Sequence, residues 1–193
     1  LVALAQQNIK RMLAYSSVGQ VGYLLMGVAA LSPLASNGVI FHLVGYGITN
    51  LAVFMCVIIF YNSTDKEEIS DFAGLADRSP LVAMAMTVSL FSLAGLPFFA
   101  GFTTKFYLFA AAADGGLLWL VGLAITNSLI SLYYYMMVMK QMYMVPAIDN
   151  TPLKISRVSG GALGVLIAGV IVVGVYPGPL VDAIEAATRA ILP

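Results

Sequence analysis

A lysine stands inside one of the most apolar stretches of this sequence, and an amine in that setting can carry a proton. Lys105 lies within the string GFTTKFYLF, residues 101–109. It is eight residues short of Ala113, about 12 Å of helix, which is a long way for its ammonium to reach toward water. A charge at the centre of a bilayer costs roughly 2.5–3.5 kcal/mol, so such residues usually face a wet cavity and mark a route for protons or ions. A lysine that reaches the outer interface is the other interpretation.

Further polar side chains recur at helical spacing on neighbouring apolar segments. Side chains three or four residues apart share one face of a helix. Hydroxyls, amides and one imidazole on such faces would hold water in a line if they met near the lysine, and imidazole is suited to exchanging protons. Each stripe alone equally fits hydrogen bonds between helices. The three stripes are His42, Tyr46 and Asn50; Asn127, Ser131 and Tyr135; and Ser16, Gln20 and Tyr23.

The segment that carries the lysine also predicts a broken helix. Residues 92–101 contain Gly95, Pro97 and Gly101. Proline removes a backbone donor and disturbs the preceding turn, while glycine tolerates unusual dihedral angles. In a bilayer, such a break persists only where its freed carbonyls face protein or a water-filled cavity, and transporters place ion sites at broken helices. An ordinary proline kink that only shapes packing is the alternative.

Composition indicates that these residues belong to membrane-spanning helices. Hydrophobic residues make up 61% of the chain and charged residues only 9%, against about 25% charged in soluble domains. A bilayer core of ~30 Å takes about 20 apolar residues per crossing. We therefore predict an all-α membrane protein, a single domain over residues 1–193. Its five expected spans are 12–31, 38–61, 81–113, 117–139 and 160–176, with a loop at 62–80 and an interfacial segment at 180–192.

The sequence excludes several classes of site. Nine basic and nine acidic residues leave no net charge for nucleic acid. Cys56 is the single cysteine and His42 the single histidine, so neither a metal cluster nor a bound redox centre is expected. No nucleophilic triad or phosphate-binding loop is present. We expect no catalytic residue and no cofactor in this chain.

The cations predict the orientation. Short loops rich in Lys and Arg stay in the cytoplasm. One end of the predicted bundle collects seven of them, whereas the other has only Arg189, beside Asp114, Asp182 and Glu185. The N-terminal end of the chain is therefore expected inside the cell and its C-terminus outside. The seven are Lys10, Arg11, Lys66, Arg78, Lys140, Lys154 and Arg157.

Three ordered strings carry a family resemblance. AQQNIKRMLAYSS (residues 5–17), SLAGLP with GFTTKFY (92–97 and 101–107) and SLYYY (131–135) closely resemble the antiporter-like subunits of respiratory complex I. Among these, the N-type subunit of bacterial NADH-quinone oxidoreductase, related to mitochondrial subunit 2, matches best. The resemblance covers nearly the whole chain. Because the chain starts at Leu1 without an initiator Met, we expect a piece of a longer protein.

The resemblance implies a role for the chain. That family folds as fourteen transmembrane helices in two inverted repeats, and this chain looks like helices ten to fourteen. Lys105 falls on the lysine thought to pass protons outward; Tyr46 stands where the L-type subunit has a lysine, which favours the N type, and His42 departs from the N-type pattern. NADH, FMN, iron–sulfur clusters and quinone would be used by other subunits. The implied setting is the inner (plasma) membrane, among the other membrane subunits of complex I, with the quinone pool as an indirect partner.

Two other functions remain open. A multisubunit cation/proton antiporter or a membrane-bound hydrogenase would use similar motifs. A structural membrane scaffold without an ion path belongs to a different class. The resemblance implies that the fragment alone would not translocate protons, because the family's other pathway residues lie outside it, and we expect no catalytic activity of the fragment alone.

Overall fold

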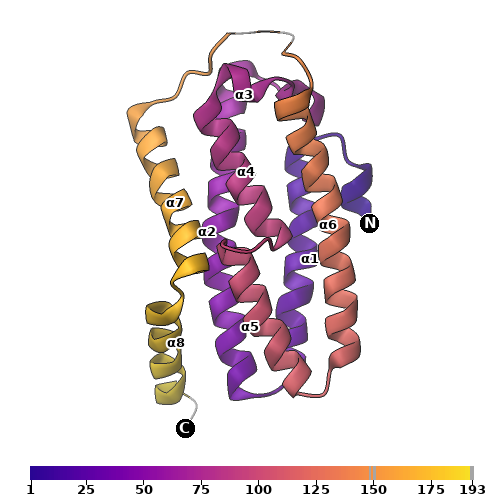
Figure 1. Cartoon of the computed structure of the whole chain (residues 1–193), viewed down its shortest axis with the longest axis vertical. Helices are drawn as coiled ribbons and strands as arrows, with labels where there is room; N and C mark the ends of the chain where they lie inside the picture. The colour runs from indigo at the N-terminus through magenta and orange to yellow at the C-terminus, as the bar shows by residue number, and fades with distance from the viewer. Residues whose placement is uncertain (148, 150, 192–193) are drawn as a thin grey trace.

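The computed structural model describes residues 1–147, 149 and 151–191, which form a bundle of roughly antiparallel helices (Figure 1). Within these residues, four helices are long and apolar enough to cross a membrane. They are α1 (Ile9–Ala29), α2 (Pro33–Thr64), α6 (Leu118–Met144) and α7 (Arg157–Val175). The helices α1 and α7 run in one direction along the bundle, and α2 and α6 run in the other (Figure 1).

A fifth crossing is made by two shorter helices that follow one another. The helices α4 (Pro80–Ala94) and α5 (Ala100–Asp114) have 15 residues each, about 22 Å of helix, which is less than the ~30 Å of a bilayer core. Figure 1 shows them end to end, with a short connection midway along the bundle. The prediction of an all-α membrane protein with five transmembrane helices, one of them discontinuous, is confirmed.

Local capping decides where the helices begin and end. The side chains of Asn8, Ser32 and Ser156 each accept a hydrogen bond from a backbone N–H of the first turn, which satisfies a donor that the helix cannot. At the other end of α2, Ser63 and Thr64 donate to the carbonyls four residues earlier. These polar residues therefore continue helices beyond the apolar runs: α2 covers 33–64 where the sequence suggested a span of 38–61.

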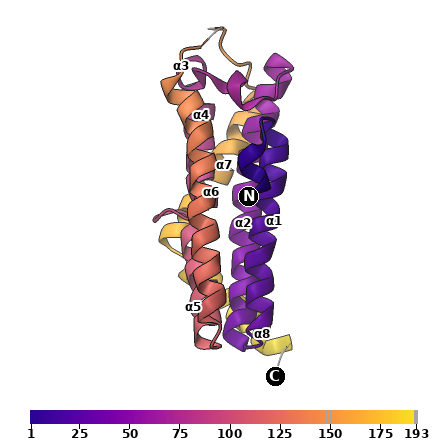
Figure 2. The same ribbon diagram turned by 90° about the vertical axis from the view of Figure 1, so that its right-hand side faces the viewer.

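The C-terminal segment forms an amphipathic helix, α8 (Gly178–Ile191). It continues below α7 and lies against the lower part of α2 (Figure 1). Ile184 and Thr188 are buried on one side, whereas Asp182 and Arg189 are exposed on the other. The expected interfacial segment ended at 192, which lies outside the described residues. At the N-terminal end, the short 3₁₀ helix η1 (Val2–Ala5) packs beside α1 (Figure 2).

The connection between α2 and α4 folds back onto the bundle. It contains the 3₁₀ helix η2 (Ile69–Phe72) and the single-turn helix α3 (Leu75–Arg78). Phe72 and Leu75 are fully buried, and the ring of Phe72 stacks on that of Phe60 with 3.9 Å between centroids. The loop expected at 62–80 is therefore packed onto the bundle at these two side chains.

A clamp of polar contacts joins this connection to the start of α1. The Lys10 ammonium lies 2.6 Å from a Glu67 carboxylate oxygen, and Asn8 donates to the same carboxylate at 2.7 Å. Backbone bonds from Ile9 N to Glu67 O and from Ile69 N to Gln7 O run alongside. These contacts hold the chain entering α1 against the connection that follows α2.

Acidification is expected to loosen this clamp. The hydrogen bonds from Lys10 and Asn8 hold the pKa of Glu67 below its ordinary value of about 4.5. A carboxyl whose pKa is lowered by folding stabilises the fold above the unfolded pKa, and loses that contribution as pH falls through the folded pKa. The full-length protein in detergent should therefore melt slightly above its Glu67→Gln variant at pH 7, and the difference should shrink below about pH 4.5 and vanish once the pH falls below the folded pKa of Glu67. A difference that persists unchanged at low pH would contradict a role for the Glu67 charge.

Candidate functional site

The site is built around the connection between α4 and α5. Gly95 ends α4 in the left-handed region, with φ of +88°, and its N–H donates to Phe91 O and Ser92 O. Leu96 N also donates to Phe91 O, which gives the pattern of a Schellman-type helix end. Phe98 takes a positive φ of 74° before α5 begins. The break is therefore an ordered turn of residues 95–99 rather than a bend in one continuous helix.

A close approach of the two half-helices fixes the geometry of the break. A Cβ atom on Gly101 would lie 1.7 Å from Ser92 O, which leaves room for glycine alone. The Gly101 N–H donates to Ser92 Oγ at 3.0 Å, and Thr49 Oγ1 on α2 lies 3.0 Å from that same hydroxyl. The start of α5 is thereby tied to the end of α4 and to the neighbouring helix.

The carbonyls freed at the end of α4 find partners on three other helices. Leu93 O accepts from Lys105 Nζ at 2.7 Å and from Gln20 Nε2 at 3.2 Å. Ala94 O accepts from Ser128 Oγ at 2.8 Å. Because an unpartnered backbone carbonyl is costly in a bilayer, these side chains both stabilise the break and are positioned by it.

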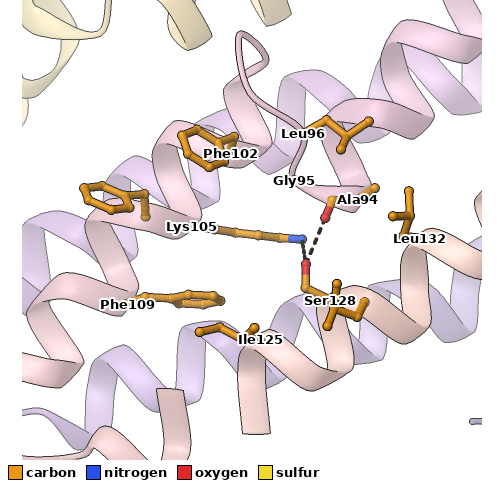
Figure 3. A pocket seen from close by; sticks show the side chains of 11 residues that line it. Ala94, Gly95, Leu96, Phe102, Lys105, Phe109, Ile125, Ser128 and Leu132 are labelled. Atoms are coloured by element: carbon orange, nitrogen blue, oxygen red, sulfur yellow. Dashed lines mark hydrogen bonds between the residues drawn. The ribbon is translucent and has the colours of Figure 1, made fainter. Parts of the chain in front are cut away.

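Lys105 is the charged side chain at this centre, and it is only 4% exposed. Besides its bond to Leu93 O, its Nζ donates to Ser128 Oγ at 3.2 Å and lies 4.9 Å from the centroid of the Tyr23 ring. Figure 3 shows the side chain passing between Phe102 and Phe109 toward Ser128. Within the described part of the chain, Lys105 forms no ion pair with a carboxylate. Its amine is held by a carbonyl, a hydroxyl and an aromatic face.

A cavity of about 320 Å³ opens beside the amine. It lies between the break, α5 and α6, and its side chains are apolar apart from Lys105 and Ser128 (Figure 3). Phe106 and Leu129, both 64% exposed, stand at its edge. The cavity is far larger than the 10–15 Å³ that one water requires. Water or another small molecule therefore has room to reach Lys105 from the side of the bundle.

His42 lies on the opposite side of α5 from this cavity. Its Nδ1 is 3.0 Å from Oγ1 of Thr104, the residue before Lys105. Its ring meets that of Tyr23 edge-on and stacks on Tyr46, with centroids 6.2 and 6.3 Å apart. His42 is 1% exposed, and its Nε2 has no hydrogen-bond partner among the residues described. The imidazole thus joins α2 to the lysine-bearing helix.

The predicted stripes meet around Lys105 to different extents. From α6, Asn127 donates to Tyr23 Oη at 2.9 Å, so these two stripes touch directly beside the amine. Tyr135 is fully buried and hydrogen-bonded to Ser16. Ser131 donates to the carbonyl of Ser128 on its own helix. The bonds from Tyr135 to Ser16 and from Asn127 to Tyr23 join α6 to α1 at two heights.

Two predicted residues on α2, Tyr46 and Asn50, make no hydrogen bond to Lys105 within the described residues. Tyr46 donates to Ser17 Oγ at 2.7 Å. Asn50 is half-buried and its side chain makes no hydrogen bond within the described residues. The polar stripe of α2 is therefore joined to the site through His42 rather than along its whole length.

Ser128 is the residue that sequence reasoning missed. It receives a hydrogen bond from Lys105 and donates one to Ala94 O, so it bridges the amine to the break. It directly follows Asn127, and consecutive residues of a helix point about 100° apart. The sequence signal that could have identified Ser128 is its spacing of three residues from Ser131, which places the two serines on one face of the helix.

Comparison with known proteins identifies the family of this chain. The family described as NADH:quinone oxidoreductase/Mrp antiporter, transmembrane, matches residues 1–131. The chain belongs to this family. The resemblance drawn from the three sequence strings is thereby confirmed, and the matched region contains the break, Lys105 and Ser128.

Individual known proteins are similar to this chain in sequence and fold. NADH-quinone oxidoreductase subunit N of Moorella thermoacetica is 43% identical over all of this chain, which covers 41% of that protein. An archaeal membrane-bound sulfane sulfur reductase contains a chain with 30% identity and a TM-score of 0.90, of which this chain covers 39%. Respiratory complex I from Thermus thermophilus contains one with 23% identity and a TM-score of 0.88, of which it covers 40%. The chain thus spans about two fifths of the length of the relatives it matches.

Proposed function

We propose that the chain is part of an N-type membrane subunit of an NADH:quinone oxidoreductase, and that it moves protons through Lys105. The observation that carries this proposal is an almost fully buried amine bonded to Leu93 O at the break and facing a cavity. A buried amine without a carboxylate partner gains little from staying charged. Such a group can accept and release a proton as its surroundings change.

The neighbouring side chains supply the steps on either side of the amine. Ser128 links Lys105 to the cavity side, because its hydroxyl accepts from Nζ and donates to the break. Tyr23 with Asn127, and Thr104 with His42, provide hydroxyl, amide and imidazole groups on the other sides. Waters between these groups would complete a line for proton transfer. We place Tyr46, Asn50, Ser131 and Tyr135 in the outer parts of this pathway.

In this proposal, electron transfer takes place in other subunits of the complex. No three His, Cys, Asp or Glu side chains come together as a metal site in the described residues. NADH, FMN, iron–sulfur clusters and quinone are assigned to other subunits, and this subunit acts as a non-redox translocase coupled to them. Its partners are the other membrane subunits and, through them, the quinone pool.

The distribution of Lys and Arg in the loops indicates which end of the bundle faces the cytoplasm in the proposed setting, the cell inner (plasma) membrane. The clamp at Lys10 and Glu67 places the N-terminal end of α1 and the connection after α2 at one end of the bundle. Six further cations lie at or near that end, whereas α8 ends at the other (Figure 1). By the excess of Lys and Arg in cytoplasmic loops, we assign the first end to the cytoplasm and the C-terminus to the outside.

The likeness to a chain of an archaeal membrane-bound sulfane sulfur reductase favours a second candidate, a related multisubunit respiratory or cation/proton antiporter complex. Purification separates the two. The full-length protein, tagged and extracted from native membranes in a mild detergent, should co-purify with flavin and iron–sulfur subunits that reduce quinone with NADH. Co-purification of membrane subunits alone, without NADH oxidation, would instead support the antiporter.

A further inference from the structure

We infer that the cavity beside Lys105 binds a lipophilic weak acid, namely a single-chain carboxylic acid dissolved in the bilayer. Binding there would regulate the proposed proton site. Only the effect on pumping rests on the proposed function, because binding itself depends on the cavity and its charge.

The shape of the cavity suits the chain of such a molecule. Apolar side chains form its walls, among them Leu96, Phe102, Phe109, Ile125 and Leu132. Its volume of about 320 Å³ and its exposed edge at Leu129 give an alkyl chain room and an entrance from the side of the bundle. A cavity with these walls is poorly suited to hold many ordered waters, because waters need several polar partners each.

The polar end of the cavity suits a carboxylate. Lys105 Nζ and Ser128 Oγ are its polar side-chain atoms, 3.2 Å apart. The ammonium has no carboxylate partner within the described residues. A carboxylate that accepts from Nζ would form a charge-assisted hydrogen bond, which is about twice as strong as a neutral one. The charge of the site therefore selects an acid over an alcohol or an ester.

Depth in the membrane selects a weak acid over a phospholipid. The cavity lies at the break, midway along the bundle (Figure 1), where a permanently charged phosphate would be costly. A carboxylic acid reaches this depth as the neutral molecule. Its O–H proton can then pass to the lone pair of neutral Nζ, giving an ammonium and a carboxylate with no change in the charge of the cavity. The bound pair holds that proton on Lys105 and so blocks its exchange.

Photolabelling of the complete complex tests the inference. Dodecanoic acid with a diazirine at its chain end should label peptides of α5 and α6. Replacement Lys105→Gln keeps a hydrogen-bond donor but removes the charge, and should lower labelling roughly ten-fold. Leu129→Trp should lower it by a similar factor because the indole fills the entrance. The matched control is Leu123→Trp, at a similarly exposed position of α6 away from the cavity. This variant should be labelled to the same extent as the unaltered protein.

Two results would overturn the inference. Equal labelling by dodecanol with the same diazirine would mean that the cavity is an apolar lipid groove that does not recognise the acid. Stronger labelling by a diazirine phospholipid, lost in Lys105→Gln, would assign the site to a lipid headgroup. Neither result depends on pumping, so failure of the proposed proton path would be seen separately.

Discussion

Replacing Lys105 with alanine in the complete complex is expected to lower proton pumping by roughly a hundred-fold, because a proton then has no amine to occupy at the break. A charge at mid-membrane costs about 2.5–3.5 kcal/mol without a partner site, and each 1.36 kcal/mol is a factor of ten in rate. The variant also leaves Leu93 O with Gln20 as its remaining side-chain donor. Dye quenching in inverted membrane vesicles measures the pumping, and electron transfer is followed at the same time.

The control for this variant is Lys140→Ala. Lys140 lies on α6 with an exposed side chain, outside the polar network around the break. Its loss should leave pumping and assembly close to normal. If Lys105→Ala pumps normally in a fully assembled complex, the chain is a structural scaffold and the proton path proposed through the amine is wrong.

The sequence was sufficient to predict much of the architecture. Apolar run length identifies a membrane span because the bilayer sets a minimum number of residues, and all the long helices follow from it. The broken helix was predicted from Gly95, Pro97 and Gly101 because each has a local backbone effect that does not depend on tertiary contacts. Lys105 was conspicuous for a similar reason, since a charge in such an apolar string requires an explanation.

Contacts between helices could not be predicted in the same way. Nothing in the periodicity indicates that Gln20 reaches Leu93 O or that Ser128 bridges Lys105 to Ala94 O. These bonds depend on the rotation and height of each helix in the bundle, which packing determines. The burial of Phe72 in the loop expected at 62–80 could not be predicted for the same reason, because it depends on contact with Phe60 of α2.

The close approach at Gly101 predicts the largest structural effect of a single methyl group. In Gly101→Ala the new Cβ would lie 1.7 Å from Ser92 O and 2.6 Å from Ser92 C. Both are backbone atoms, so the half-helices must separate rather than a side chain turn away. Overpacking of this kind costs typically about 1–3 kcal/mol and occasionally more. Separation would also lengthen the bond from Lys105 to Leu93 O, so both the melting temperature and pumping should fall.

Gly122→Ala is the matched control, because Gly122 lies within α6 and a Cβ there meets nothing within 4 Å. Alanine in that helix should be neutral or slightly stabilising, by up to about 1 kcal/mol. The comparison is made on the full-length protein, with melting measured in detergent and the amount of assembled complex measured in native membranes. Equal melting of the two variants would mean that α5 can move away from α4 without cost. In that case the position of Lys105 would not depend on the contact between Gly101 and Ser92, and the break would have to be held by the turn at residues 95–99 alone.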